Sequence, residues 1–177
     1  MIRYLVPKRP SILFVGINPH FGSYSRGVPF SNNKSFWYLL NASGLIKESR
    51  ETLKDDAGLK RFYLLKFSKR YNYGFVNLVD RPTRSTASLR RGEEKYGVER
   101  VRRLIAIHKP IVVCFIGKVT FAKFSGSKKF GLGFQQRGMG SSKVFVSSFP
   151  IRGPAITRIK EFRMLGRLIR KQAQPFG

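Results

Sequence analysis

The sequence predicts one α/β domain with three layers, in which a short, mostly parallel sheet of four strands lies between two layers of helices. Short apolar runs alternate with longer amphipathic stretches, which is typical of strand–helix–strand units. The apolar runs lack the alternation of a strand with one wet face, and this indicates strands covered on both sides. At 177 residues, 42% of them hydrophobic, the chain suits a single core. We expect this domain over residues 1–170 and a basic, polar tail over 171–177.

Four uniformly apolar runs predict the strands, at residues 11–16, 75–79, 111–116 and 144–148. Apolar residues at helical spacing predict helices at 35–43, 53–67, 93–108 and 156–169. Gly44 follows the first helix as a C-cap. The last helix carries several basic residues on its outward side: Arg158, Lys160, Arg163, Arg167 and Arg170. In such a sheet, ligands bind beyond the carboxyl ends of the strands, so we expect a site where the four following loops meet.

The charge of the chain points to a polyanionic partner. Lys and Arg number 35 against nine Asp and Glu, which gives a formal net charge of +26. Such an excess destabilises a compact chain by self-repulsion unless a polyanion binds it, and this favours DNA or RNA. An anionic membrane surface and a generally basic proteome are alternatives. No stretch reaches the roughly 18 apolar residues of a membrane span, so we expect no membrane insertion.

Cysteine and histidine usage predicts a reducing compartment and no cofactor. The one cysteine, Cys114, lies inside an apolar run, where a buried thiol in a strand is expected. Without a possible disulfide or a secretory signal, the cytoplasm is the expected location. Two histidines, His20 and His108, cannot form a metal site alone, and we expect neither metal nor cofactor.

The loop after the first strand holds a rigid polar group. Gly16 permits a tight turn out of the strand, and Pro19 restricts Asn18 to extended geometry. An amide is thereby fixed at the mouth of the sheet. The alternative is an ordinary turn in which Asn18 satisfies its own backbone.

Several short motifs occur in register on the predicted loops: Gly-Ile-Asn-Pro at 16–19, Pro-Phe at 29–30, Phe-Trp at 36–37, Leu-Val-Asp-Arg-Pro-Thr at 78–83, and Ile-Gly-Lys at 116–118. Over residues 12–150 the chain resembles the uracil-DNA glycosylase superfamily, most closely its mismatch-specific uracil/thymine branch. The resemblance implies a monofunctional glycosylase of base excision repair, which flips a deaminated or mismatched base from DNA and hydrolyses its N-glycosidic bond.

The resemblance also implies a role for each residue of the base pocket. Asn18 would hold the attacking water, and it would act as a positioner because an amide is a poor proton acceptor. Gly16, Ile17 and Ser23 would line the base, with backbone N–H groups near Ile17 and Ser23 stabilising the departing pyrimidine. Phe30 would stack on the flipped base. The plainer alternatives are a core phenylalanine at 30 and an exposed loop serine at 23.

Other residues of the same loops would contact DNA. Lys34, Arg81, Thr83 and Lys118 suit phosphate binding. After the last strand the family has Asn-Pro-Ser-Gly, but residues 149–152 here read Phe-Pro-Ile-Arg, so a preference for mismatches does not carry over. Ile151 and Arg152 would wedge into the duplex, unless this stretch is only a turn between strand and helix. Duplex DNA is the expected partner of a monomeric, nucleoid-associated protein.

Two other functions compete with this hypothesis. The altered motif at 149–152 also fits a DNA-binding module on the same fold that has lost catalysis. A dinucleotide-binding enzyme is disfavoured because the Gly-rich phosphate fingerprint is absent.

Overall fold

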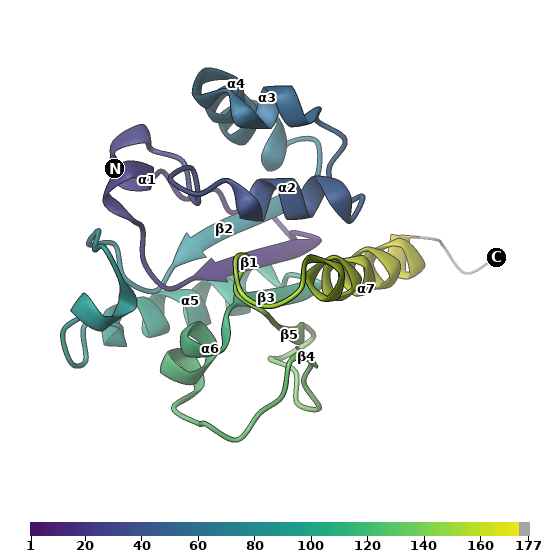
Figure 1. Ribbon diagram of the computed structural model, residues 1–177. Helices are drawn as coiled ribbons and strands as arrows, with labels where there is room; N and C mark the ends of the chain where they lie inside the picture. Colours follow the sequence, from purple (N-terminus) through teal and green to yellow (C-terminus); the bar gives the residue numbers. More distant parts are fainter. Residues whose placement is uncertain (174–177) are drawn as a thin grey trace.

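A computed structural model describes residues 1–173 and contains one sheet with the strand order β2-β1-β3-β5-β4 (Figure 1). The bounds are β1 Ile12–Gly16, β2 Tyr73–Asn77, β3 Val112–Ile116, β4 Gly133–Phe134 and β5 Lys143–Ser147. The expectation of a four-stranded sheet is wrong: the sheet has five strands within the described residues and is mixed, because β4 pairs antiparallel with β5. A strand of two residues in a glycine-rich segment has no periodicity by which the sequence could reveal it.

The other four strands coincide closely with the apolar runs and pair in parallel. β2 ends two residues earlier than expected. Its continuation still follows β1, because the backbone N–H groups of Leu78 and Val79 donate to the carbonyls of Gly16 and Ile17 at 2.9 and 2.8 Å. The two loops at this end of the sheet are therefore tied together from their first residues.

Helices lie on both faces of the sheet (Figure 1). Their bounds are α1 Phe21–Arg26, α2 Ser35–Ala42, α3 Arg50–Lys54, α4 Asp56–Phe62, a π-helical turn Tyr63–Phe67, a 3₁₀ turn Thr86–Ser88, α5 Lys95–His108, α6 Lys118–Ser125 and α7 Ala155–Ala173. None of the helices within residues 1–173 combines the length and apolar character that crossing a membrane requires.

Alternate residues of each strand divide the core into two parts. In β1, Phe14 packs into a cluster with α2, α3, α4 and α7, whereas Leu13 and Val15 pack with α5 and α6. This two-sided burial explains the uniformly apolar runs. Cys114 lies fully buried in the first cluster, where burial raises the pKa of its thiol.

The helix predicted over residues 53–67 is not one helix. Asp55 has an extended backbone, with φ −72° and ψ 129°, and ends α3. Its carboxylate accepts from the N–H of Gly58 at 2.6 Å and so begins α4. Asp55 therefore divides the predicted helix into two. Its side chain forms the hydrogen bond that a backbone carbonyl would otherwise form at the start of α4.

The first residues of the expected tail, 171–173, belong to the last helix. α7 continues to Ala173, and residues 174–177 of the expected tail lie outside the described residues. The sequence also gave no sign of α1 and α6, which occupy the predicted loops after β1 and β3.

Candidate active site

The loops after β1, β2, β3 and β5 meet at one edge of the sheet and enclose a cavity of about 910 Å³. This cavity, called the pocket below, is lined from the first loop by Ile17, Asn18, His20, Ser23 and Phe30, from the second by Asn77 and Thr83 to Thr86, from the third by Gly117 to Thr120, and from the fourth by Ser148, Phe149 and Ile151 to Gly153. The expected convergence of the four loops is therefore present.

The amide of Asn18 is held in a fixed orientation at the pocket wall. Its Nδ2 donates to Oγ1 of Thr83 at 2.7 Å and to the carbonyl of Pro19 at 3.1 Å. None of the hydrogen bonds described for residues 1–173 uses Oδ1, so this oxygen remains available as an acceptor on a residue that lines the pocket. Such an arrangement can hold a water molecule, because Oδ1 can accept a hydrogen bond from it.

Thr83, which is predicted to contact DNA, has its hydroxyl bound within the protein. Its side chain is buried, and its Oγ1 donates to the carbonyl of Ser85 at 2.7 Å while accepting from Asn18. Its backbone N–H donates to the carbonyl of Pro19 at 3.1 Å. Thr83 thus joins the loops after β1 and β2 and fixes which way the Asn18 amide faces.

Phe30 forms an aromatic wall of the pocket together with core rings. Its backbone is left-handed, with φ +54°, which is unfavourable for a residue with a side chain and must be held by its surroundings. The ring lies 4.7 Å from Phe36 and 5.8 Å from Phe75, centroid to centroid. Phe149, across the pocket mouth, lies 6.4 Å away. Phe30 is therefore both packed against the core and open to the pocket. Its place in the core is compatible with the predicted stacking on a base.

Asn77 is a pocket residue that the sequence reading missed. It is 2% exposed, ends β2 beside Gly16 of β1, and lines the pocket. The sequence feature that could have revealed Asn77 is its polar amide at the carboxyl end of an otherwise apolar strand. Gly16 makes room for it: a Cβ at position 16 would lie 2.3 Å from Oδ1 of Asn77 and 3.2 Å from Cζ of Phe75.

We expect Gly16→Ala to destabilise the fold by about 1–3 kcal/mol, because the new methyl group must displace the buried amide of Asn77 or the ring of Phe75. Urea denaturation measures the free energy of unfolding. Gly131→Ala is the matched control, since nothing lies within 4 Å of a Cβ there. Equal stability of the two variants would contradict the close packing at Gly16.

A charged cluster supports the backbone behind Asn77. Arg100 donates to the carbonyl of Asn77 at 2.7 Å and to both carboxylate oxygens of Asp80 at 2.6 and 2.9 Å. The hydroxyl of Tyr4 donates to Asp80 at 2.5 Å. Burial acts to raise the pKa of Asp80, but the hydrogen bonds from Arg100 and Tyr4 outweigh it and lower the pKa. The cluster fixes the end of β2 and therefore the position of Asn77.

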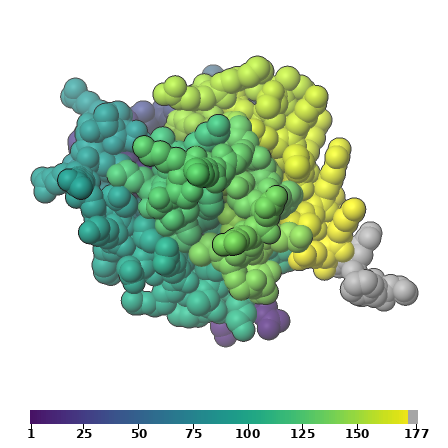
Figure 2. Space-filling view, turned by 90° about the horizontal axis from the view of Figure 1, so that it is seen from below, coloured from purple at the N-terminus to yellow at the C-terminus, as the bar shows by residue number. Residues whose placement is uncertain are grey.

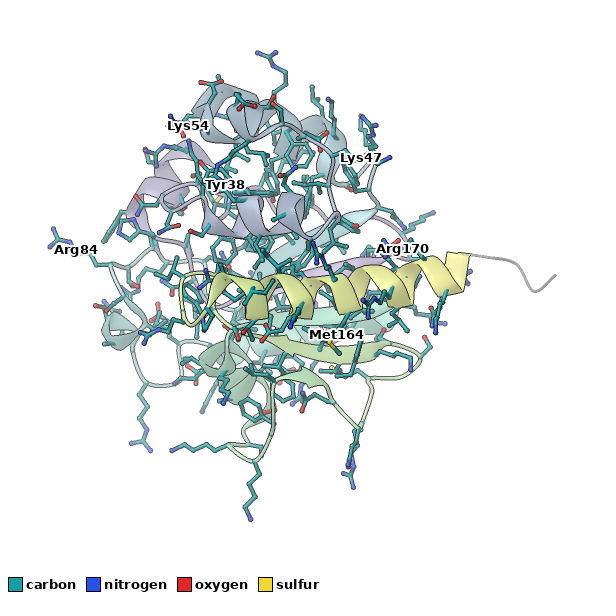
Figure 3. The ribbon with its side chains drawn as sticks, turned by 45° about the vertical axis from the view of Figure 1, so that its right-hand side comes forward. Tyr38, Lys47, Lys54, Arg84, Met164 and Arg170 are labelled. Carbon is teal, nitrogen blue, oxygen red and sulfur yellow. The ribbon has the colours of Figure 1, made fainter. Side chains whose placement is uncertain are left out.

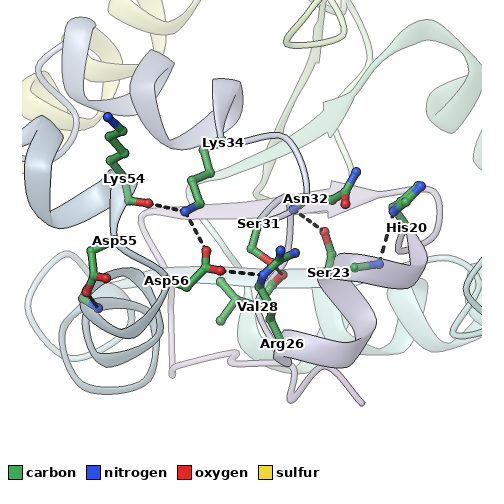
Figure 4. A network of polar contacts seen from close by, with 12 residues as sticks. His20, Ser23, Arg26, Val28, Ser31, Asn32, Lys34, Lys54, Asp55 and Asp56 are labelled. Atoms are coloured by element: carbon green, nitrogen blue, oxygen red, sulfur yellow. Dashed lines mark hydrogen bonds and ion pairs between the residues drawn. The ribbon is translucent and has the colours of Figure 1, made fainter.

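Ser23 is buried within α1, so the alternative of an exposed loop serine is wrong. Its hydroxyl accepts from the backbone N–H of Asn32 at 3.0 Å (Figure 4). Nδ1 of His20 accepts from the N–H of Gly22 at 3.2 Å and caps α1. Both side chains thus shape the loop that carries Asn18, and both line the pocket.

Lys34 and Arg81, which are predicted to contact DNA, do not line the pocket and are held in ion pairs. Lys34 pairs with Asp56 at 2.6 Å and donates to the carbonyl of Lys54 (Figure 4). Arg81 binds Glu93 through two hydrogen bonds of 2.6 and 2.8 Å, which lower the pKa of that carboxyl to about 2. The chain has nine acidic residues, and the fold pairs two of them with Lys34 and Arg81. The spacing of these residues in the sequence does not reveal the pairing.

Lys118, Ile151 and Arg152 do lie at the mouth of the pocket, and all three are exposed. Lys118 begins α6 directly after Gly117, whose φ of +90° favours glycine. A Cβ at position 117 would also approach the ring of Phe149 to 3.4 Å. The basic and apolar side chains of the pocket mouth therefore face outward, where a large ligand would meet them.

Glu161 anchors the loop whose sequence departs from the family motif. Its two carboxylate oxygens accept from the backbone N–H and the hydroxyl of Ser148, at 2.8 and 2.7 Å. The carboxylate is 8% exposed and comes from α7, thirteen residues further along the chain. This anchor fixes the start of the loop, so Phe149 faces Phe30 and Ile151 remains 54% exposed.

The family model of the uracil DNA glycosylase superfamily matches residues 3–155. The matched region contains all five strands and each loop that forms the pocket.

Proposed function

The chain belongs to the uracil DNA glycosylase superfamily, and we propose that it is a monofunctional DNA glycosylase that removes uracil-type bases through a water held by Asn18. Members of this superfamily are DNA glycosylases, which are hydrolases that act on DNA. The finer parts of the proposal are the base, the residue roles, a monomeric enzyme beside the nucleoid and a place in base excision repair. The base and the residue roles rest on the pocket.

The orientation of the Asn18 amide is the observation that carries the proposal. Nδ2 is bound to Thr83 and Pro19, so Oδ1 is the atom left to accept a hydrogen bond from water. An amide does not take up a proton at neutral pH, so Asn18 positions the water without activating it strongly. The C1′–N bond then breaks with its electron pair leaving on the base, water bonds to C1′, and its proton passes to the departing base or to solvent.

Such a site depends on the leaving group. Without a strong general base, the barrier falls mainly when the departing base carries its negative charge well, which favours uracil over cytosine. The base would stack on Phe30, and stacking of this kind contributes about 1–3 kcal/mol. Phe149 narrows the mouth opposite Phe30 and would contact the same base.

We expect Asn77 to read the edge of the flipped base. Its amide offers one donor and one acceptor group, which match the carbonyl and N–H of uracil. Asn77→Ala should therefore lower kcat/KM for uracil excision by about 10- to 100-fold, which corresponds to one or two lost hydrogen bonds. Single-turnover cleavage of a uracil-containing duplex measures it.

The control for Asn77→Ala is Thr86→Ala, which trims an exposed polar side chain at the rim of the same pocket. Thr86→Ala should keep its activity. An Asn77→Ala protein with unchanged kcat/KM would remove Asn77 from base recognition and leave the role of Asn18 in place.

The direct test of the function is a panel of duplex oligonucleotides that contain G·U, A·U, G·T or hypoxanthine. The protein is incubated with each, and alkali then converts abasic sites to strand breaks. We expect breaks with uracil and none without alkali, because a monofunctional enzyme leaves the backbone intact. Binding of these duplexes without any breaks would instead support the alternative of a DNA-binding module that has lost catalysis.

A further inference from the structure

The outer face of α7 carries a row of cations, called the basic stripe here. Its five members are all exposed: Lys160, Arg163, Arg167, Arg170 and Lys171. The first four recur at intervals of three or four residues, and Lys171 lies four residues after Arg167, so all five lie along one side of the helix. The opposite side is buried through Glu161, Phe162 and Leu165. Figure 3 views this helix from outside the molecule, with Arg170 labelled.

In the part of the chain that the structure describes, the charges of the basic stripe are not paired with acidic side chains. The one acidic residue of α7, Glu161, points inward and binds Ser148. Within residues 1–173, no ion pair involves a member of the stripe. Like charges at these intervals destabilise a helix, so the arrangement favours an anion that binds the whole row.

The length and spacing of the stripe match a DNA strand. Eleven residues separate its first and last members, which is about 16 Å along a helix axis. One strand of B-DNA carries a phosphate about every 3.4 Å of its axis, so the same length offers about five phosphates. Three of the five cations are arginines, whose planar groups bind phosphate oxygens in pairs.

The stripe leads away from the pocket. α7 begins just after the loop at the pocket mouth and returns along the sheet, so its far end is about 27 Å of helix beyond Gly153. In Figure 2 the yellow atoms of α7 form one side of the molecule, beside the green face of α6 and the segment that follows it. The far end of the stripe therefore lies well away from the pocket mouth.

We propose that the basic stripe binds the phosphate backbone of a second stretch of DNA, separate from the stretch over the pocket. The inference rests on DNA as the partner in the proposed function, but not on catalysis. Holding two segments at once allows the protein to pass from one to the other without dissociating fully, which speeds a search along undamaged DNA.

Stopped-flow dissociation from undamaged DNA tests the proposal. The protein is bound to a fluorescent duplex without a target base, and unlabelled duplex is added at rising concentration. We expect the dissociation rate to rise severalfold with competitor, because the second duplex binds before the first leaves. Replacing all five stripe residues by Gln should abolish this dependence, since glutamine keeps the helix but removes the charge.

The control protein carries five Gln substitutions on the α4 side, at exposed bases outside the described ion pairs: Lys47, Lys60, Arg61, Lys69 and Arg70. It should retain the competitor dependence. Three results would overturn the proposal: no competitor dependence in the unaltered protein, the same dependence in the stripe variant, or an equal loss in the control. Vesicles with phosphatidylserine form a second arm, and loss of vesicle binding alone would assign the stripe to a membrane. Undamaged DNA keeps every outcome independent of base excision.

Discussion

Asn18→Ala should lower the rate of uracil excision by roughly 10²- to 10⁴-fold, the range for loss of a positioned catalytic group. The substitution removes Oδ1, the acceptor that would hold the attacking water, and releases the tie to Thr83. Affinity for a uracil-containing duplex should change little, because the aromatic wall and the cations of the pocket mouth remain. Single-turnover cleavage and fluorescence anisotropy measure the two quantities separately.

Two further variants make this prediction specific. Asn32→Ala removes an exposed amide from the rim of the same pocket and should cleave at the normal rate. Thr83→Val keeps the shape of the side chain but loses the hydroxyl that orients Asn18. Its excision rate should therefore lie between those of the Asn18→Ala and Asn32→Ala enzymes. An Asn18→Ala enzyme with undiminished turnover would show that the water is held elsewhere.

Trp37→Ala should destabilise the fold by about 3–5 kcal/mol, the cost of truncating a large buried aromatic side chain. Trp37 is fully buried and packs edge-on against Phe36, Phe62 and Phe67, with centroids 5.1 to 5.8 Å away. Urea denaturation provides the measurement. Leu65→Ala on the same layer is the control, because Leu65 is 56% exposed and its loss should change stability little.

Trp37 also connects this core to the pocket. Its Nε1 donates to the carbonyl of Pro29 at 2.8 Å, directly before the left-handed Phe30. Trp37→Phe retains most of the packing but loses this bond, at a cost of about 0.5–1.5 kcal/mol. We expect a raised KM with a smaller effect on kcat, because Phe30 is held less firmly. A Trp37→Phe enzyme with normal KM would mean that packing against Phe36 alone fixes Phe30.

Local patterns were sufficient where one element could be recognised alone. The four apolar runs became four parallel strands, because strands buried on both faces must be apolar at every position. The break at Asp55 and the short strand β4 escaped prediction for a related reason. A single capping residue or a two-residue pairing leaves too short a pattern.

The same distinction holds for the residues of the pocket: some were predicted from local motifs, and others depend on distant partners. Motifs in the sequence located Asn18, Phe30, Lys118 and Ile151, and each lies in the pocket. Asn77 and Glu161 were not predicted, because the role of each depends on a residue in a distant element: Gly16 for Asn77 and Ser148 for Glu161. Pairings of this kind carry no fixed spacing along the chain.

By itself, the sequence determined that this chain has four apolar strands covered on both faces, that the loops after them converge at one edge, and that it carries a large excess of positive charge. Only the tertiary structure decided which cations are free. Lys34 and Arg81 are bound to Asp56 and Glu93, whereas no ion pair found over residues 1–173 involves the basic stripe on α7. The physical reason is that secondary structure follows from short-range periodicity, but the partner of a charged side chain depends on which elements the folded chain brings together.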